Sequence, residues 1–265
     1  MPEVDINAKD VMKLRQKTGL SMMECKKALI EAGGDQEAAE DFLRKKMKGK
    51  MDTRTDRVAG EGRIAIAIEG GKAAIVELRA ETDFTAKNDN FVNAAQDLAK
   101  LALTGASDDE LSKSIDELRI STGENISVAR AQVAQGGGFG QYIHHDGKTG
   151  VLLVCNNTID ESVGKQIGMH ITSAVPVPQG VTSADVPEAV IEKERKFALE
   201  LAEQEGKPKE IAEKMVEGKI KKLYSELALL EQDFVVDPSK KVKDVLGDAD
   251  ATAFYRWQVG EEAGE

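Results

Sequence analysis

Two stretches of the chain share one apolar pattern around a glycine turn, and this repeat constrains the fold more than any other feature. The segment GRIAIAIEGGKAAIVEL at 62–78 predicts two strands joined by a Gly-Gly turn, and GQYIHHDGKTGVLLVC at 140–155 follows the same plan. A helical run comes after each strand pair. Because a lone hairpin cannot bury a sheet face, the repeat predicts an α+β fold with two related subdomains. We place them at 62–139 and at 140–186 with 233–265, and expect GGGFG at 136–140 to be a flexible joint.

Residues 1–48 have the pattern of three short helices. Thr18-Gly19 ends the first helix and Gly33-Gly34 ends the second. Ser21 and Glu24 form a capping-box sequence between them, and Asp35 can cap the third helix. The expected buried stripe of that third helix is Ala38, Ala39, Phe42 and Leu43. A polar linker should follow at 49–61.

Residues 187–232 have a 4-3 rhythm of apolar positions that is typical of a coiled coil. A Gly-x-Pro break divides the run into two arms, each about 30 Å long at about 1.5 Å per residue. We therefore expect an antiparallel helical hairpin that projects from the body. The expected seam consists of Val190, Glu194, Phe197, Leu201 and Gln204 in the first arm, and of Val216, Ile220, Leu223, Leu227 and Leu230 in the second.

Composition limits the classes of partner. The net charge of −11 argues against a chain whose main role is to grip nucleic acid or an anionic membrane. Cys25 and Cys155 lie far apart and outside any CxxC pair, which fits a reducing compartment. The N-terminus lacks a basic region followed by an apolar one, and the longest apolar run, VLLVC, is too short to span a bilayer. We expect a cytoplasmic protein.

The sequence contains no constellation of nucleophile, base and orienting acid, so we expect no catalytic residue, metal or cofactor. His144 and His145 are adjacent in a strand-like segment, where they would point to opposite faces. A metal-dependent enzyme that uses these two histidines and Cys155 is one alternative. His170 lies in a helical run, and a lone histidine there is more often a packed or surface residue than a ligand.

The stretch ETDFTAKND, residues 81–89, raises a question about Phe84, the one large apolar side chain among its polar neighbours. Phe84 is spaced like the first member of an apolar helix face formed by Phe84, Asn88, Phe91, Ala95 and Leu98. In that interpretation Asp83 is the N-cap, Phe84 is a core residue, and the chain could be an interaction scaffold. The other interpretation is an exposed probe for a partner. Spacing alone favours the core.

Five segments, in this order along nearly the whole chain, resemble bacterial elongation factor Ts. They are TGLSMMECKKALIEAGGD, ETDFTAKND, TGENI, GKPKEIAEKMVEGKIKKLYSELALLEQDFVVDPSK and RWQVGE. That family exchanges guanine nucleotide on the GTPase elongation factor Tu, which would be the partner here. The resemblance implies a three-helix (UBA-like) N-terminal domain, a core of two related subdomains and an inserted antiparallel coiled-coil hairpin.

The resemblance also implies functional residues. In the family, a Thr-Asp-Phe-Val tetrapeptide enters the GTPase domain, and its Phe acts as a wedge that disturbs the phosphate-binding loop and dislodges Mg²⁺. The motif falls on Thr82, Asp83, Phe84 and Thr85, where Thr85 replaces the usual Val. Partner contacts are implied at Met22, Met23, Lys26, Thr122, Gly123, His170, Val235 and Val236.

Overall fold

The computed structural model describes residues 6–52 and 57–261. Residues 1–5, 53–56 and 262–265, which belong to the predicted head, linker and second subdomain, lie outside the described residues. The chain combines helices with small antiparallel sheets, as an α+β fold requires. It divides into two compact units: unit 1 is Met1–Arg63, Val76–Ala131 and Val259–Glu265, and unit 2 is Ile64–Ile75 and Gln132–Gln258. The division falls inside strands, and the subdomain boundaries expected from the sequence stay predictions.

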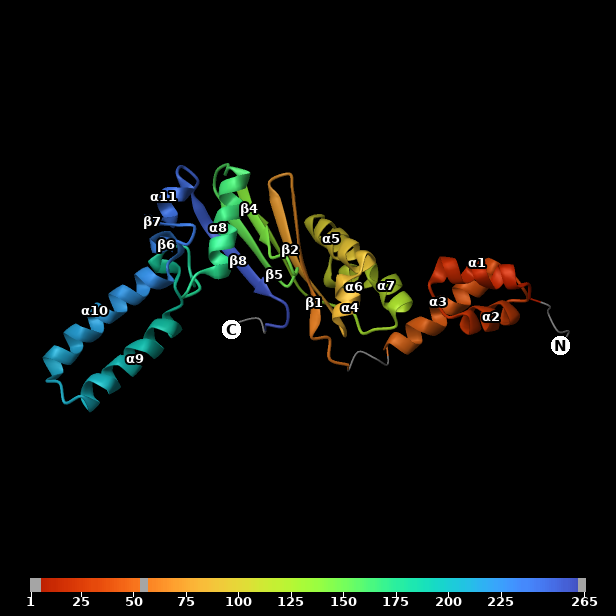
Figure 1. Ribbon diagram of the computed structural model, residues 1–265, viewed down its shortest axis with the longest axis horizontal. Helices are drawn as coiled ribbons and strands as arrows, with labels where there is room; N and C mark the ends of the chain where they lie inside the picture. Colours follow the sequence, from red (N-terminus) through yellow and green to blue (C-terminus); the bar gives the residue numbers. More distant parts are fainter. Residues whose placement is uncertain (1–5, 53–56, 262–265) are drawn as a thin grey trace. The chain divides into compact units, whose positions relative to one another are not determined.

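Three helices make up the first part of unit 1: α1 (Ala8–Thr18), α2 (Met22–Glu31) and α3 (Gln36–Asp52) (Figure 1). Their ends follow the predicted caps. Gly19 ends α1 at a φ of 69°, Ser21 Oγ accepts a bond of 3.3 Å from the Glu24 amide, and Asp35 Oδ1 accepts one of 2.8 Å from the Ala38 amide. The core between the helices consists of Val11, Leu14, Leu20, Cys25, Ala28, Leu29, Ala39, Leu43 and Met47.

The buried face of α3 differs from the prediction. Ala38 and Phe42 are exposed, whereas Ala39, Leu43 and Met47 are buried, because a repeat of four residues keeps this single face toward the core. Met47 adds one more buried position to this face, just before residue 48, where the head is expected to end. The helix therefore continues to Asp52, into the segment expected to be linker.

Two three-stranded sheets share one chain order. The first is β1 (Glu61–Glu69), β2 (Lys72–Ala80) and β3 (Ser127–Gln135), and the second is β4 (Gly138–Ile143), β5 (Thr149–Cys155) and β8 (Ala251–Gln258). Each begins with a predicted hairpin, whose second strand is central and pairs with a strand from later in the chain. Both hairpins are confirmed, and the repeat extends to a third strand in each sheet.

Helices follow each hairpin. After β2 come α4 (Asp83–Lys87), α5 (Asp89–Leu103), α6 (Asp108–Ser114) and α7 (Asp116–Thr122), and after β5 comes α8 (Glu161–Ser173). The rest of unit 2 consists of a 3₁₀ turn at Ser183–Asp185, α9 (Glu188–Gln204), α10 (Lys209–Leu227), a second 3₁₀ turn at Leu229–Glu231, β6 (Asp233–Phe234), β7 (Asp237–Lys241) and α11 (Val242–Leu246).

The glycines at 136–140 are packing positions, so the prediction of a flexible joint is wrong. A Cβ on Gly137 would lie 2.0 Å from the carbonyl oxygen of Asn156. On the facing helix α8, a Cβ on Gly164 would lie 2.7 Å from Cα of Gly140. Real side chains do not fit these gaps, so glycine is what lets the backbone of α8 approach β4 this closely.

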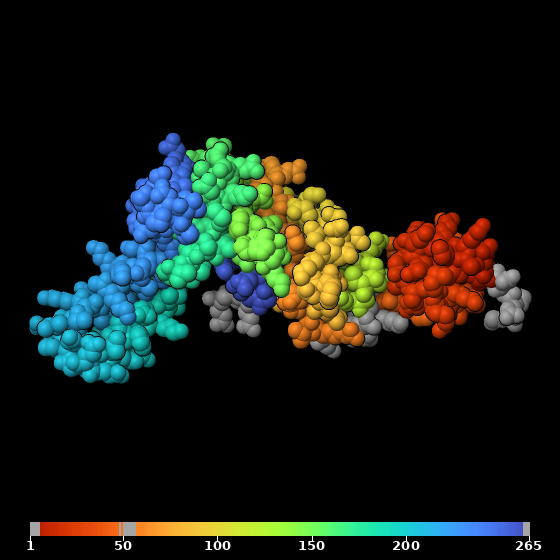
Figure 2. Space-filling view, viewed as in Figure 1, coloured from red at the N-terminus to blue at the C-terminus, as the bar shows by residue number. Residues whose placement is uncertain are grey.

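The helices α9 and α10 form the predicted antiparallel hairpin, and they lie side by side in the space-filling view (Figure 2). The predicted seam of the first arm is wrong by one position. Phe197 and Leu201 are exposed, because the small Ala198 and Ala202 face the partner helix instead. Lys219 Nζ lies 5.5 Å from the ring centre of the exposed Phe197. The buried residues are Ile191, Ala198 and Ala202 in α9, and Ala212, Val216, Ile220 and Leu227 in α10.

No helix in the described part of the chain is long and apolar enough to cross a membrane.

A buried polar pair ties α8 to the segment after the hairpin. His170, which is 1% exposed, lies with its Nε2 2.9 Å from Oε1 of Gln232. Its Nδ1 accepts a bond of 3.2 Å from the amide of Val235. Because Nδ1 accepts, the ring is neutral and Nε2–H donates to Gln232. Burial lowers the pKa of His170, and the bond to Gln232 opposes that shift.

We expect the free energy of unfolding to fall as the pH drops below about 6.5, the ordinary pKa of histidine, because the unfolded chain takes up a proton that folded His170 resists. This contribution is present above that pH and is lost on acidification. Urea unfolding at a series of pH values measures it. The His170→Gln variant should show a shallower fall between about pH 7 and 5, and the matched control His145→Gln should keep the wild-type slope. An equally steep fall in both variants would contradict the assignment.

Candidate functional site

Phe84 is exposed, and the core interpretation of it is wrong. The side chain is 84% exposed, whereas Phe91 is fully buried. The helix face predicted from spacing is interrupted at Asn88, whose backbone is extended with φ −69° and ψ 138° and whose side chain caps α5. Phe84 therefore belongs to the separate, short helix α4. The N-cap of α4 is Thr82 and not Asp83, since Thr82 Oγ1 accepts from the Thr85 amide at 3.3 Å.

One carboxylate holds the turn that presents Phe84. Oε2 of Glu124 accepts bonds of 3.1 Å from the amides of both Glu81 and Thr82. Oε1 of Glu124 accepts from the hydroxyl of Thr82 at 2.6 Å and from that of Thr85 at 2.7 Å. These four bonds match the roughly four acceptor sites of a carboxylate. Phe84 thus lies between two residues that are each anchored to Glu124.

A reciprocal bond joins the same two segments a second time. The carboxylate of Glu81 accepts a bond of 2.6 Å from the amide of Asn125. Arg57 forms an ion pair of 3.3 Å with Glu81, and its carbonyl accepts a bond of 2.7 Å from the side chain of Asn125. Asn125 is buried. The segments 81–85 and 122–125 are therefore clamped together by side chains from both.

The predicted contact residues Thr122 and Gly123 lie at the end of α7, directly before Glu124. Gly123 ends the helix at a φ of 69°, in the left-handed region that favours glycine. This turn directs the chain so that the next residue reaches the start of α4. The structure thus brings Thr122 and Gly123 beside the Thr82–Thr85 motif, although about 40 residues separate them in sequence.

Asp83 lies next to Phe84 on the partly exposed face of α4. Its Oδ2 forms an ion pair of 2.7 Å with Nζ of Lys87, one helical turn later. The hydrogen bond from Lys87 lowers the pKa of Asp83, so the carboxylate is charged at neutral pH. A solvated ion pair of this kind contributes little to stability and is easily exchanged for another partner.

Two further groups of predicted contact residues lie elsewhere. Met22, Met23 and Lys26 are exposed on the first turns of α2, with Met23 64% exposed. In unit 2, Val235 and Val236 are exposed between β6 and β7. His170 is buried, so it does not present its side chain to a partner; it holds the backbone of Val235 instead.

The alternative of a metal-dependent enzyme does not fit the geometry. His144 and His145 lie in the turn after β4, not in a strand, and their ring centres are 4.3 Å apart, so the prediction that they point to opposite faces is wrong. Cys155 ends β5. Ile143 pairs with Gly150 at one end of this hairpin and Gly138 with Cys155 at the other, roughly 17 Å away at about 3.3 Å per residue. Burial raises the pKa of Cys155 to about 11, which disfavours the thiolate. Among the described residues no group of three or more His, Cys, Asp or Glu could hold a metal ion.

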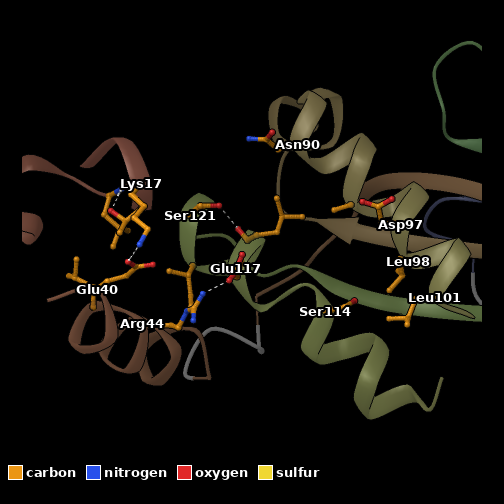
Figure 3. A pocket seen from close by; sticks show the side chains of 16 residues that line it. Lys17, Glu40, Arg44, Asn90, Asp97, Leu98, Leu101, Ser114, Glu117 and Ser121 are labelled. Atoms are coloured by element: carbon orange, nitrogen blue, oxygen red, sulfur yellow. Dashed lines mark hydrogen bonds and ion pairs between the residues drawn. The ribbon is translucent and has the colours of Figure 1, made fainter. Parts of the chain in front are cut away.

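A pocket of about 650 Å³ lies in unit 1, and Phe84 is not among the residues that line it (Figure 3). Lys17 points toward Glu40 and Arg44 toward Glu117 at its polar side, and both contacts are ion pairs. Helix α5 lines the other side with the apolar Leu98 and Leu101 and with the polar Asn90 and Asp97. This pocket is lined by none of the residues predicted for the site.

Sequence reasoning missed Glu124 as a site residue. The TGENI segment carries part of the family resemblance and the implied contacts Thr122 and Gly123, but a single glutamate after them has many ordinary roles. The available signal was the pair of threonines around Phe84, because two hydroxyls and two free amides at a helix start need an acceptor.

Comparison with known proteins shows the family of this chain. A family model described as "Elongation factor TS" matches residues 81–261, from the start of the Phe84 turn to the end of the described chain. Among curated relatives, elongation factor Ts of Pasteurella multocida is 42% identical over 97% of this chain and 93% of its own length. Those of Ruegeria sp. and Rickettsia typhi are each 38% identical, over 97% and 98% of this chain and 93% and 94% of theirs. The chain belongs to the elongation factor Ts family.

Proposed function

We propose that this chain is the guanine-nucleotide exchange factor of elongation factor Tu, with Phe84 as the residue that converts binding into loss of GDP. Membership of the elongation factor Ts family implies nucleotide exchange on elongation factor Tu during translation elongation. The observation that supports the role of Phe84 is its 84% exposure on a turn fixed by four hydrogen bonds. The proposal places the chain in the cytoplasm and requires no catalytic residue, cofactor or bound nucleic acid.

Exchange of this kind is a coupling of two binding equilibria. The factor must bind the nucleotide-free GTPase more tightly than the GDP-bound form, and whatever affinity it gains there, GDP loses. Exchange requires no proton transfer, and no covalent bond forms or breaks. An exposed apolar side chain on a hydrogen-bonded turn suits this task because it gains most by entering a pocket that only one state of the partner offers.

One phenylalanine is not sufficient for the whole effect. Burial of a Phe side chain contributes about 1.5–3 kcal/mol, which is less than the binding energy of a tightly held nucleotide. Further contact area has to come from other exposed apolar groups. We assign this role to Met22 and Met23 with Lys26 in the first unit, to the Thr122-Gly123 turn, and to Val235 and Val236 in the second.

The nucleotide-bound Mg²⁺ is the second target of the proposed mechanism. In GTPases the ion neutralises charge on the phosphates, so its displacement weakens GDP binding strongly. We assign the displacement to the Thr82–Thr85 turn, with Phe84 as the wedge and Asp83 as its charged neighbour. Asp83 can exchange its solvated pairing with Lys87 for a contact on the partner, because that ion pair is exposed.

We expect the Phe84→Ala variant to slow release of fluorescent GDP from elongation factor Tu about ten- to hundredfold, the equivalent of one buried Phe contact. Its free energy of unfolding should stay within about 0.5 kcal/mol of the wild type, because the side chain is exposed. The matched control Phe91→Ala removes a buried ring and should lose about 3–5 kcal/mol of stability. Normal exchange by the Phe84→Ala variant would contradict the wedge, and tight binding without exchange by the wild type would favour a scaffold.

The Mg²⁺ step predicts a specific ion dependence. Raising free Mg²⁺ should slow GDP release in the presence of the wild-type chain, because the ion competes with its own displacement. The Phe84→Ala variant should respond less steeply. Stopped-flow release at a series of Mg²⁺ concentrations, with ionic strength held constant by NaCl, measures both slopes. A wild-type rate indifferent to Mg²⁺ would exclude the ion-displacement step while leaving exchange itself in place.

A further inference from the structure

We infer that Glu124 is a positioning residue for the exchange reaction: its carboxylate fixes the turn on which Phe84 is presented. The inference rests on the proposed exchange function and concerns a residue outside the Thr82–Thr85 motif. Glu124 does not have to touch the partner. It acts through the two threonines that lie on either side of Phe84.

The need for such a residue follows from the exposure of Phe84. A buried side chain is oriented by its neighbours, but a side chain that is 84% exposed has few contacts to hold it. The turn must then be fixed through its backbone. Helix α4 has only five residues, Asp83–Lys87, and a helix this short is not stable by itself.

Glu124 supplies what the short helix lacks. Two amides at the start of α4, those of Glu81 and Thr82, donate to one of its oxygens, and two hydroxyls donate to the other. Thr82 Oγ1 in turn accepts from the amide of Thr85. The carboxylate, the cap and the first turn of the helix therefore form one connected network.

This network also accounts for Thr85, the position where the chain departs from the Val of the family motif. The Thr85 hydroxyl donates to Glu124 at 2.7 Å, so its polar atom is satisfied within the chain. A hydroxyl already bonded inside the protein does not have to be desolvated against the partner. Thr85 therefore adds one anchor to the turn without adding an unpaired hydroxyl.

A fixed turn favours exchange because the turn that carries Phe84 is already ordered before the partner binds. Each side chain immobilised at an interface costs about 0.5–1.5 kcal/mol, and a preorganised one avoids most of that loss. The orientation of Phe84 matters as well as the entropy cost of ordering it. A Phe84 turn that moved aside on contact would not distort the partner. The hydrogen bonds to Glu124 must therefore keep the turn in place while Phe84 strains the partner.

The decisive experiment compares Glu124→Ala with Glu110→Ala. Glu110 is a suitable control because its carboxylate also accepts from an amide and a hydroxyl at a helix start, those of Ser107, both at 2.8 Å. At saturating factor, Glu124→Ala should slow GDP release from elongation factor Tu about three- to tenfold, and Glu110→Ala should leave it unchanged. Equal rates for the two variants would overturn the inference.

Two further variants separate positioning from a general loss of structure. In the Phe84→Ala background, Glu124→Ala should slow release no further, because Glu124 acts through Phe84; additive losses would overturn the inference. Glu124→Gln should retain most of the rate, since its oxygen can still accept from the two amides and its NH₂ can donate to the two hydroxyls. A Glu124→Gln variant as slow as Glu124→Ala would overturn the hydrogen-bond mechanism.

Amide hydrogen exchange provides a readout that needs no partner. Loss of the carboxylate in Glu124→Ala should accelerate exchange at the amides of Glu81 and Thr82, while the amides of the α5 interior stay protected. If the wild-type chain does not accelerate GDP release from elongation factor Tu, the proposed function is wrong. The amide measurement still decides whether Glu124 holds the turn. Unchanged protection at both amides would overturn the positioning role by itself.

Discussion

A fully buried carboxylate fixes the strand that leads into the turn of Phe84. Glu77 on β2 has no exposed surface, and such a charge is tolerable only when it is paired and fully hydrogen-bonded. Arg79 Nε donates to it at 2.7 Å, Arg130 Nε at 2.6 Å and the amide of Gly260 at 3.0 Å. These bonds tie β2 to β3 and to the turn after β8 within unit 1. β2 ends at Ala80, so the turn that carries Phe84 begins directly after the strand that these bonds hold.

The fold features that could be predicted from the sequence are those whose sequence pattern lies within a single helix or hairpin. The hairpins, the head helices and the α9–α10 pair follow from local glycine turns, caps and apolar periods, all of which act over a few residues. The 4-3 spacing places Phe84 in the core because it ignores the helix break at Asn88. There Asn88 Oδ1 accepts a bond of 2.9 Å from the amide of Asn90 and so caps a new helix. A period has meaning only inside a continuous helix.

The remaining errors concern contacts between segments distant in sequence. The glycines at 136–140 were expected to give flexibility, but their lack of a Cβ serves close contact with Asn156 and Gly164. Glu124 was missed for the same reason, because its donors lie about 40 residues earlier and no local rule connects them. The resemblance to a family identified Phe84 where spacing did not, but it could not indicate what holds Phe84 in place.

In both units a polar side chain forms hydrogen bonds to the backbone at or beside an exposed apolar residue. An apolar residue that must stay exposed cannot be held by core packing, so a polar side chain behind it accepts hydrogen bonds from its backbone or from its neighbours. Glu124 does this for the turn of Phe84, and buried His170 does it for Val235. Phe84 is left 84% exposed and Val235 45% exposed, while the backbone at or beside each residue is hydrogen-bonded to the polar side chain. A surface built in this way keeps its hydrophobic area for a partner and has already lost the conformational freedom that binding would otherwise remove. Under the proposed exchange function, firmer holding of Phe84 by Glu124 and of Val235 by His170 strengthens the coupling to the partner.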